Sequence, residues 1–308
     1  MKSLRTPKKW TAPLFFFLFI MVAWPAQGES VSLRLSFNPN FISKGDLNTW
    51  VESLNSLWED WQRREGGTLS GKFESIHYKP SFEGEVRINL IYGLALNFAV
   101  SYLSDKKEGT VRFQKGEGNH EESHLILNEV KAVPLKLGIS YTFSLPYQFN
   151  ISLGAGRHII FVTYSTEDNY DYNTISAGRE YSYSLEKDNT FRSESLGYYV
   201  SVGVEYNLTK FLALELSGEK TWSKVDGFKG PYSFQEFKSW LPVNEQKYSE
   251  EGKASLYYYE SKNNTLNQYY TVLSGHKKRP DTLDVINMRQ GELNFGGFIL
   301  KIGIRLKI

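Results

Sequence analysis

The sequence predicts an all-β fold: a transmembrane antiparallel up-and-down β-barrel of eight strands, with short turns at one end and long loops at the other. Three observations predict it. Apolar side chains occupy every second position in segments of strand length, as in the closing "FILKIGIRLKI" of residues 298–308. Short and long connections alternate along the chain. The chain begins like an exported protein and has no later apolar run long enough for a spanning helix, so strands must cross the membrane.

The first residues predict a cleaved signal peptide, residues 1–28. Residues 1–13 contain four basic side chains and no acidic one, and the apolar run "LFFFLFIMVAW" follows. That run is about half of the roughly 20 residues that a membrane-spanning helix needs, and the small residues Ala26 and Gly28 suit cleavage. We therefore expect the mature chain, residues 29–308, to form one barrel domain.

The charge and cysteine content exclude two classes of protein. Of 36 basic and 34 acidic residues, removal of the signal peptide leaves 32 basic and 34 acidic, which gives no support to nucleic-acid binding. The chain has no cysteine, so neither disulfides nor a lipidated terminal cysteine can be present. Attachment to the membrane must come from the fold itself.

Alternation of apolar and polar residues predicts the strands in order. The predicted segments are 31–41, 80–91, 94–105, 125–143, 149–165, 195–207, 211–223 and 291–308. Short turns join them near 92–93, 144–148 and 207–210, and long connections cover 42–79, 106–124, 166–194 and 224–290. A barrel with both termini in the periplasm has this asymmetry, with the long loops outside the cell.

Aromatic residues recur beside all three short turns, where a barrel meets the membrane–water boundary. With the closing strand 298–308, these features make the mature chain resemble the small eight-stranded outer-membrane barrels of the OmpA/OmpX/OmpW-like group. The resemblance implies a location in the bacterial outer membrane, contact with outer-membrane lipid and lipopolysaccharide, and recognition of 298–308 by the barrel-insertion machinery. The group usually ends on an aromatic residue, whereas this chain ends on Ile308.

The alternation also assigns charged side chains to the barrel interior. An eight-stranded lumen is filled by side chains, and an unpaired charge there is costly, so opposite charges should pair. We expect a closed, salt-bridged lumen rather than an ion-conducting path. The residues assigned to this network are Arg34, Arg87, Lys136, Glu205, Glu215, Glu219, Lys301 and Arg305.

The first long loop predicts an amphipathic helix, with Asp46 as its N-cap and Gly66–Gly67 as its end. Its apolar stripe includes Trp50, Leu54, Trp58 and Trp61. The stripe suits a lid packed on the barrel mouth, a helix lying on the outer leaflet, or the cover of a site for a small hydrophobic ligand. In the fourth loop, residues 253–274 predict a tyrosine-rich hairpin that turns at Asn263–Asn264.

Two candidate chemical sites are weak. His120 and His124 match the zinc motif H-E-x-x-H, but that chemistry requires a helix, and the match lies in an expected solvated loop just before a strand. We expect no metal site, with adventitious zinc binding by this pair as the alternative. His158, with Ser165 nearby, would be the catalytic candidate in an outer-leaflet lipid-modifying enzyme. No acid is fixed beside His158 in the sequence, so neither an enzyme nor a cofactor is expected.

The sequence thus leaves three functions to compare. The first is a closed barrel with a structural or surface-interaction role carried by its outer loops, in contact with an extracellular protein. The second is a carrier or receptor for a small hydrophobic compound under the tryptophan helix. The third is a lipid-modifying enzyme at the outer rim.

Overall fold

The computed structural model describes residues 31–41, 45–76, 78–91, 93–116, 119–176, 178–240, 244–280 and 282–308. The predicted signal peptide and Tyr92 lie outside the described residues. The elements are β1 (Val31–Phe41), α2 (Asp46–Glu65), β2 (Thr68–Lys72), β3 (Tyr78–Asn89), β4 (Leu94–Lys115), β5 (His120–Ser144), β6 (Phe149–Ser176), β7 (Arg179–Asn207), β8 (Leu212–Trp222), β9 (Lys224–Val225), β10 (Lys229–Trp240), β11 (Asn244–Asn263), β12 (Gln268–His276), β13 (Val285–Gln290), β14 (Leu293–Asn294) and β15 (Gly297–Lys307). In the described part of the chain, no helix is both long and apolar enough to cross a membrane.

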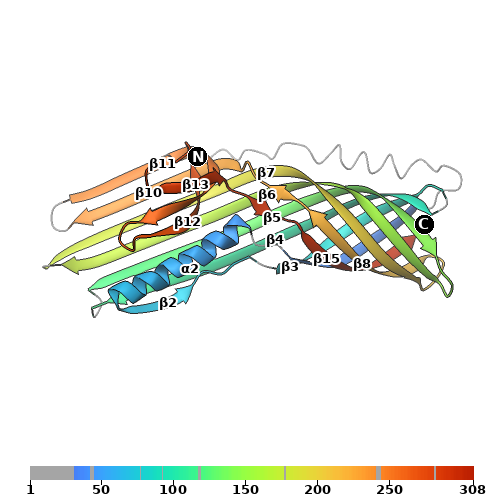
Figure 1. Cartoon of the computed structure of the whole chain (residues 1–308), viewed down its shortest axis with the longest axis horizontal. Coiled ribbons are helices and arrows are strands. Elements are labelled where there is room, and N and C mark those ends of the chain that lie inside the picture. Colours follow the sequence, from blue (N-terminus) through green and yellow to red (C-terminus); the bar gives the residue numbers. More distant parts are fainter. Residues whose placement is uncertain are drawn as a thin grey trace, which may run out of the picture.

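Eight of the described strands close into an antiparallel ring in the order β1, β3, β4, β5, β6, β7, β8 and β15. The ring closes because β15 pairs with both β8 and β1, which joins the last strand of the chain to the first. Figure 1 shows this ring at the end of the molecule that holds the C-terminus. The predicted fold class, including one helix in the first long connection, is confirmed.

The ring has an apolar outer face and a polar inner face. Leu35 is 64% exposed, whereas its neighbour Arg34 is 7% exposed, and the same contrast separates Ile302 from Lys301. On β6 the outward-facing row from Phe149 to Ile159 is apolar except at Arg157. At roughly 3.3 Å per residue and a tilt of roughly 40° this stretch is roughly 25 Å tall, the height of the apolar band of membrane barrels.

Beyond this band the four central strands continue well past their predicted ends. β6 has 28 residues and β7 has 29, and the two strands pair with each other up to Ser176 and Arg179, through most of the long connection predicted at 166–194. The prediction of a loop at 106–124 is wrong, because β4 and β5 pair with each other up to Lys115 and His120. The prediction of one strand over 291–308 is also wrong, because β14 and β15 are separate strands.

The extended strands belong to a second, extracellular part of the sheet. Here β7 pairs with β10 instead of β8, and β11 and β12 follow β10, while β2 pairs with β4 at the other edge. Helix α2 contacts β12 on one side and β2 and β4 on the other. The helix therefore fills the gap between the two edges of the sheet, as Figure 1 shows at the end opposite the C-terminus.

Candidate functional sites in the lumen and the extracellular region

The upper part of the lumen holds two lysines and two glutamates that alternate. Lys136 Nζ lies 2.7 Å from a carboxylate oxygen of Glu83 and 2.5 Å from one of Glu219. Lys301 Nζ lies 2.6 Å from the same two carboxylates. All four side chains are buried. Each charge has two opposite charges as neighbours, and this sharing offsets the cost of taking it out of water.

Arg34 connects this group to the lower lumen. Its guanidinium donates to Glu83 at 3.0 Å and to Glu85 at 2.6 Å, and it also pairs with Glu215. A planar guanidinium with several donors suits three carboxylates around one site better than a lysine would.

Arg305 is the centre of the lower lumen. It lies 3.0 Å from Glu205 and 3.1 Å from Glu85, and it shares Glu215 with Arg34. Lys307 pairs with Glu205 at 2.5 Å, nearer the periplasmic end.

Arg87 is the least engaged cation of the network. Its Nε donates to Asn97 Oδ1 at 3.1 Å and lies 3.7 Å from Glu85. The structure therefore brings together all eight residues that the sequence assigned to the charge network, and they lie with Glu83, Glu85 and Lys307.

Little free volume remains in this part of the barrel. A cavity of about 20 Å³ lies within the charge network, and another of about 50 Å³ lies above it beside His158 and Asn38. Because one water molecule needs roughly 10–15 Å³, the first cavity has room for about one water molecule and the second for a few. Gly138 leaves room for Tyr199, since a Cβ at Gly138 would overlap the tyrosine hydroxyl.

Above the lumen, α2 is fastened to the chain segment that follows β2. Asn48 donates to the carbonyl of Ile76 at 2.6 Å and accepts from its N–H at 2.9 Å. Asn55, two turns later on the same face, does the same with Phe73 at 3.0 and 2.9 Å. The two amide side chains thus satisfy backbone groups of an edge segment that would otherwise need another strand.

The start of α2 is held by a different contact. The carboxylate of Asp46 forms a two-point ion pair with Arg289 and accepts from the N–H of Glu292 at 2.7 Å. The prediction that Asp46 is the N-cap is wrong, because Gly45 occupies that position and Asp46 is the first helical residue. The end predicted at Gly66–Gly67 is correct, with Gly66 in the left-handed region at φ 65°.

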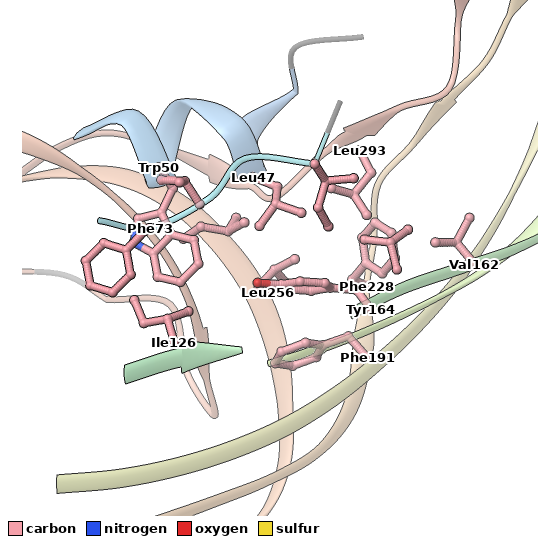
Figure 2. Close-up of a cluster of buried hydrophobic side chains, with 14 of the residues drawn as sticks. Leu47, Trp50, Phe73, Ile126, Val162, Tyr164, Phe191, Phe228, Leu256 and Leu293 are labelled. Carbon is pink, nitrogen blue, oxygen red and sulfur yellow. The ribbon is translucent and has the colours of Figure 1, made fainter. Parts of the chain in front are cut away.

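The apolar stripe of α2 faces the inside of the extracellular region. Trp50 and Trp58 are buried in one apolar cluster, and Leu54 and Trp61 pack against it. Figure 2 shows Trp50 and Leu47 on the helix side of this cluster and Phe191 on the opposite side, above its strand. A cavity beside Leu47 has about 10 Å³, which is no more than the roughly 10–15 Å³ that one water molecule needs.

His120 and His124 lie on β5 rather than in a solvated loop, and that part of the prediction is wrong. His120 Nε2 lies 2.8 Å from Glu122 and His124 Nε2 lies 2.7 Å from Asp168. Burial raises the pKa of Asp168, but the hydrogen bond and charge of His124, with the charge of Lys187, hold this pKa below its usual value. Among the described residues, no group of three potential ligands is placed to hold a metal ion.

His158 is buried above the charge network, in the wall of the 50 Å³ cavity. Its Nδ1 has no hydrogen-bond partner among the described residues. Ser165, the other residue considered for catalysis, bonds to Thr190 at 3.2 Å. These two side chains are therefore not brought together as a nucleophile and its base.

A comparison with solved structures finds several outer-membrane proteins, among them OprG, Neisserial surface protein A and OmpT. OprG from Pseudomonas aeruginosa has 10% identity and a TM-score of 0.39, with 91% of this chain and 96% of that chain covered. The Neisserial surface protein A has 14% identity and a TM-score of 0.31, with 92% and 100% covered. The outer membrane protease OmpT from Escherichia coli has 12% identity and a TM-score of 0.30, with 91% and 96% covered.

No protein-family model and no curated protein sequence matches the chain. The fold is therefore shown by the strand pairing of the chain itself. In its closed ring of eight antiparallel strands, the predicted resemblance to small eight-stranded outer-membrane barrels is confirmed.

Glu83 is absent from the residues that the sequence assigned to the charge network, although it contacts three cations in the lumen. The signal was available, because Glu83 shares the odd-numbered row of β3 with Glu85 and Arg87. By contrast, nothing in the local sequence indicates that Asn48 and Asn55 bond to residues more than fifteen positions away.

Proposed function

We propose that this protein is a non-conducting barrel of the bacterial outer membrane that displays a rigid extracellular region for surface interactions. The observation that supports it is the double seal of its interior. The charge network fills the membrane part, and the apolar cluster under α2 fills the extracellular part above it. The cavities of about 20 Å³ within the charge network and about 50 Å³ above it leave no width for a hydrated ion to pass.

The tip of the extracellular sheet supports the interaction half of the proposal. A row of rings crosses five neighbouring strands on the side of the sheet that bears the apolar cluster, with successive centroids 5.7, 5.1, 5.6 and 5.5 Å apart. The row consists of Phe113, His120, Tyr172, Tyr181 and Trp240. Trp240 is 42% exposed, and Tyr248 on the next strand is 53% exposed. Tyrosine and tryptophan are the residues that most often anchor protein interfaces.

The apolar stripe of α2 gives less support to a carrier of hydrophobic compounds. Trp50 and Trp58 already pack in a filled cluster, and the neighbouring cavity of about 10 Å³ has no space for an organic molecule. We therefore assign α2 a packing role, as the element that closes the extracellular sheet.

The test uses the folded mature protein in planar lipid bilayers, with a conducting porin reconstituted in parallel. We expect no unitary currents from this protein, and a slower or faster gel migration of the unheated than of the boiled sample. Well-resolved channel currents from a heat-modifiable preparation would contradict the closed-lumen half of the proposal.

The interaction half needs its own test. Cells that display wild-type protein or a Trp240→Ala/Tyr248→Ala variant at equal surface density would be compared for self-aggregation and for adhesion to a panel of immobilised extracellular proteins. We expect the variant to lose binding, while the matched change Tyr147→Ala at a periplasmic turn has no effect. Equal adhesion by all three would contradict the proposed surface.

A further inference from the structure

Two cations interrupt the lipid-facing side of the barrel. Arg157 on β6 and Lys220 on β8 are exposed and lie in the outward-facing rows of their strands. Among the described residues that face lipid between the periplasmic turns and the row of Ile159 and Leu196, these two are the charged ones. Their neighbours along and across the strands are apolar or aromatic, so the pair stands out from the band.

The strand register places the two cations close together. Arg157 is paired with Tyr198 on β7, Tyr198 with Trp222 on β8, and Lys220 lies two residues before Trp222. With strands roughly 4.8 Å apart and roughly 3.3 Å per residue, their Cα atoms are on the order of 12 Å apart. Two extended basic side chains can span that separation with one phosphate between them.

The height of Arg157 in the band is equally specific. Arg157 is one outward position below Ile159, which places its Cα roughly 5 Å below the outer limit of the band. Its guanidinium lies 5.3 Å from the centroid of the Tyr198 ring. Tyr198, Trp222 and Phe298 are more than half exposed beside the pair, as expected where a barrel meets lipid head groups.

A charge on the lipid face is unfavourable unless something neutralises it, and ionisable residues in a membrane therefore indicate a functional site. Neither Arg157 nor Lys220 forms an ion pair with any residue that the structure describes. The neutralising anion must come from the lipid side. A guanidinium beside an ammonium group is a favourable pair of donors for a phosphate.

We propose that Arg157 and Lys220 bind a phosphate on the head group of an anionic glycolipid in the outer leaflet. The aromatic rings of Tyr198 and Trp222 flank the same head group. This inference rests on the proposed function, because it requires the barrel to span the outer membrane with its long hairpins outside.

The experiment compares wild type, an Arg157→Gln/Lys220→Gln variant and a Lys229→Gln/Lys253→Gln control, all purified in maltoside detergent. The control removes two exposed cations from β10 and β11, so both variants lose the same charge. Native mass spectrometry would count retained lipid after addition of a bisphosphorylated glycolipid, its dephosphorylated form, or inorganic phosphate alone. We expect wild type and control to retain the bisphosphorylated form and the site variant to retain at least tenfold less.

Equal retention by all three proteins would overturn the proposal, as would equal binding of the dephosphorylated form. Displacement of the glycolipid by inorganic phosphate at comparable concentration would assign the site to free phosphate instead. Heat-modifiable gel migration of each sample separates the outcomes. A barrel that is intact but does not prefer the phosphorylated lipid refutes this inference alone, whereas a wild-type chain that forms no barrel refutes the proposed function.

Discussion

The ammonium group of Lys136 on β5 lies 2.7 Å from the carboxylate of Glu83 on β3, across the intervening strand β4. Glu83 also contacts Lys301 and Arg34, so one carboxylate joins three strands of the ring to its own. Such a contact closes the lumen and links the first strands of the chain to the last. Its removal should therefore affect the barrel as a whole.

A Glu83→Gln substitution should destabilise the folded barrel by roughly 3–5 kcal/mol, because buried cations would lose a charged partner that water cannot replace. Urea unfolding in lipid vesicles, followed by tryptophan fluorescence, would measure the change. A Glu167→Gln control, exposed on the extracellular part of β6, should change the free energy of unfolding by less than about 0.5 kcal/mol. Equal effects of the two changes would argue against a cooperative network.

The assignment of the outer face can be tested at Val202, which points away from the lumen and is half exposed. A Val202→Lys substitution places a charge deep in the apolar band and should cost roughly 2–4 kcal/mol. Val202→Leu should be nearly neutral, since it changes volume but not polarity. If Lys and Leu are tolerated equally in vesicles, the side chain does not face hydrocarbon.

The two asparagines of α2 make separable predictions. Asn48→Ala removes both hydrogen bonds to the backbone of Ile76, and Asn55→Ala removes both bonds to Phe73. Each unsatisfied buried group costs roughly 1–3 kcal/mol. Hydrogen exchange should therefore speed up at the Ile76 amide in the first variant and at the Phe73 amide in the second. Each variant is the control for the other. Equally faster exchange at both amides in both variants would mean that α2 detaches as a whole.

The His124–Asp168 pair predicts how acid affects the extracellular region. Because the folded pKa of Asp168 is lowered, the pair stabilises the fold above the unfolded pKa of about 3.9, and this contribution is lost as the pH falls through the folded value. His124→Gln removes the charge that lowers the pKa, so acid loosening should begin at a higher pH. Trp58, 6.1 Å from His124 between ring centroids, provides a fluorescence signal.

The matched control for the acid titration is Asp171→Asn, at an exposed position of β6, the strand that carries Asp168. It should leave the midpoint unchanged. Coincident acid midpoints for wild type and His124→Gln would mean that the ion pair does not contribute to the stability of this region.

The sequence predicted the membrane part of the fold in detail. The two-residue alternation of apolar and polar side chains assigned Leu35 and Ile302 to the lipid face and Arg34 and Lys301 to the lumen. The structure places all four side chains on those faces. Each membrane strand has lipid on one face and a polar lumen on the other, so the polarity of a side chain predicts which way it points. Glu83 obeys the same rule, since it is buried in the same row of its strand as Glu85 and Arg87.

Above the membrane that rule weakens, and tertiary structure decided the arrangement. Water lies outside the extracellular sheet, and its interior mixes apolar, aromatic and charged residues. The residues around His120 and His124 therefore show no clear alternation, and the sequence did not predict that β5 begins there. The pairing of β7 with β10, and the bonds from Asn48 and Asn55 to distant backbone, depend on contacts between segments far apart in sequence. Local periodicity determined which residues enter the membrane, whereas long-range hydrogen bonding decided how the remainder closes above it.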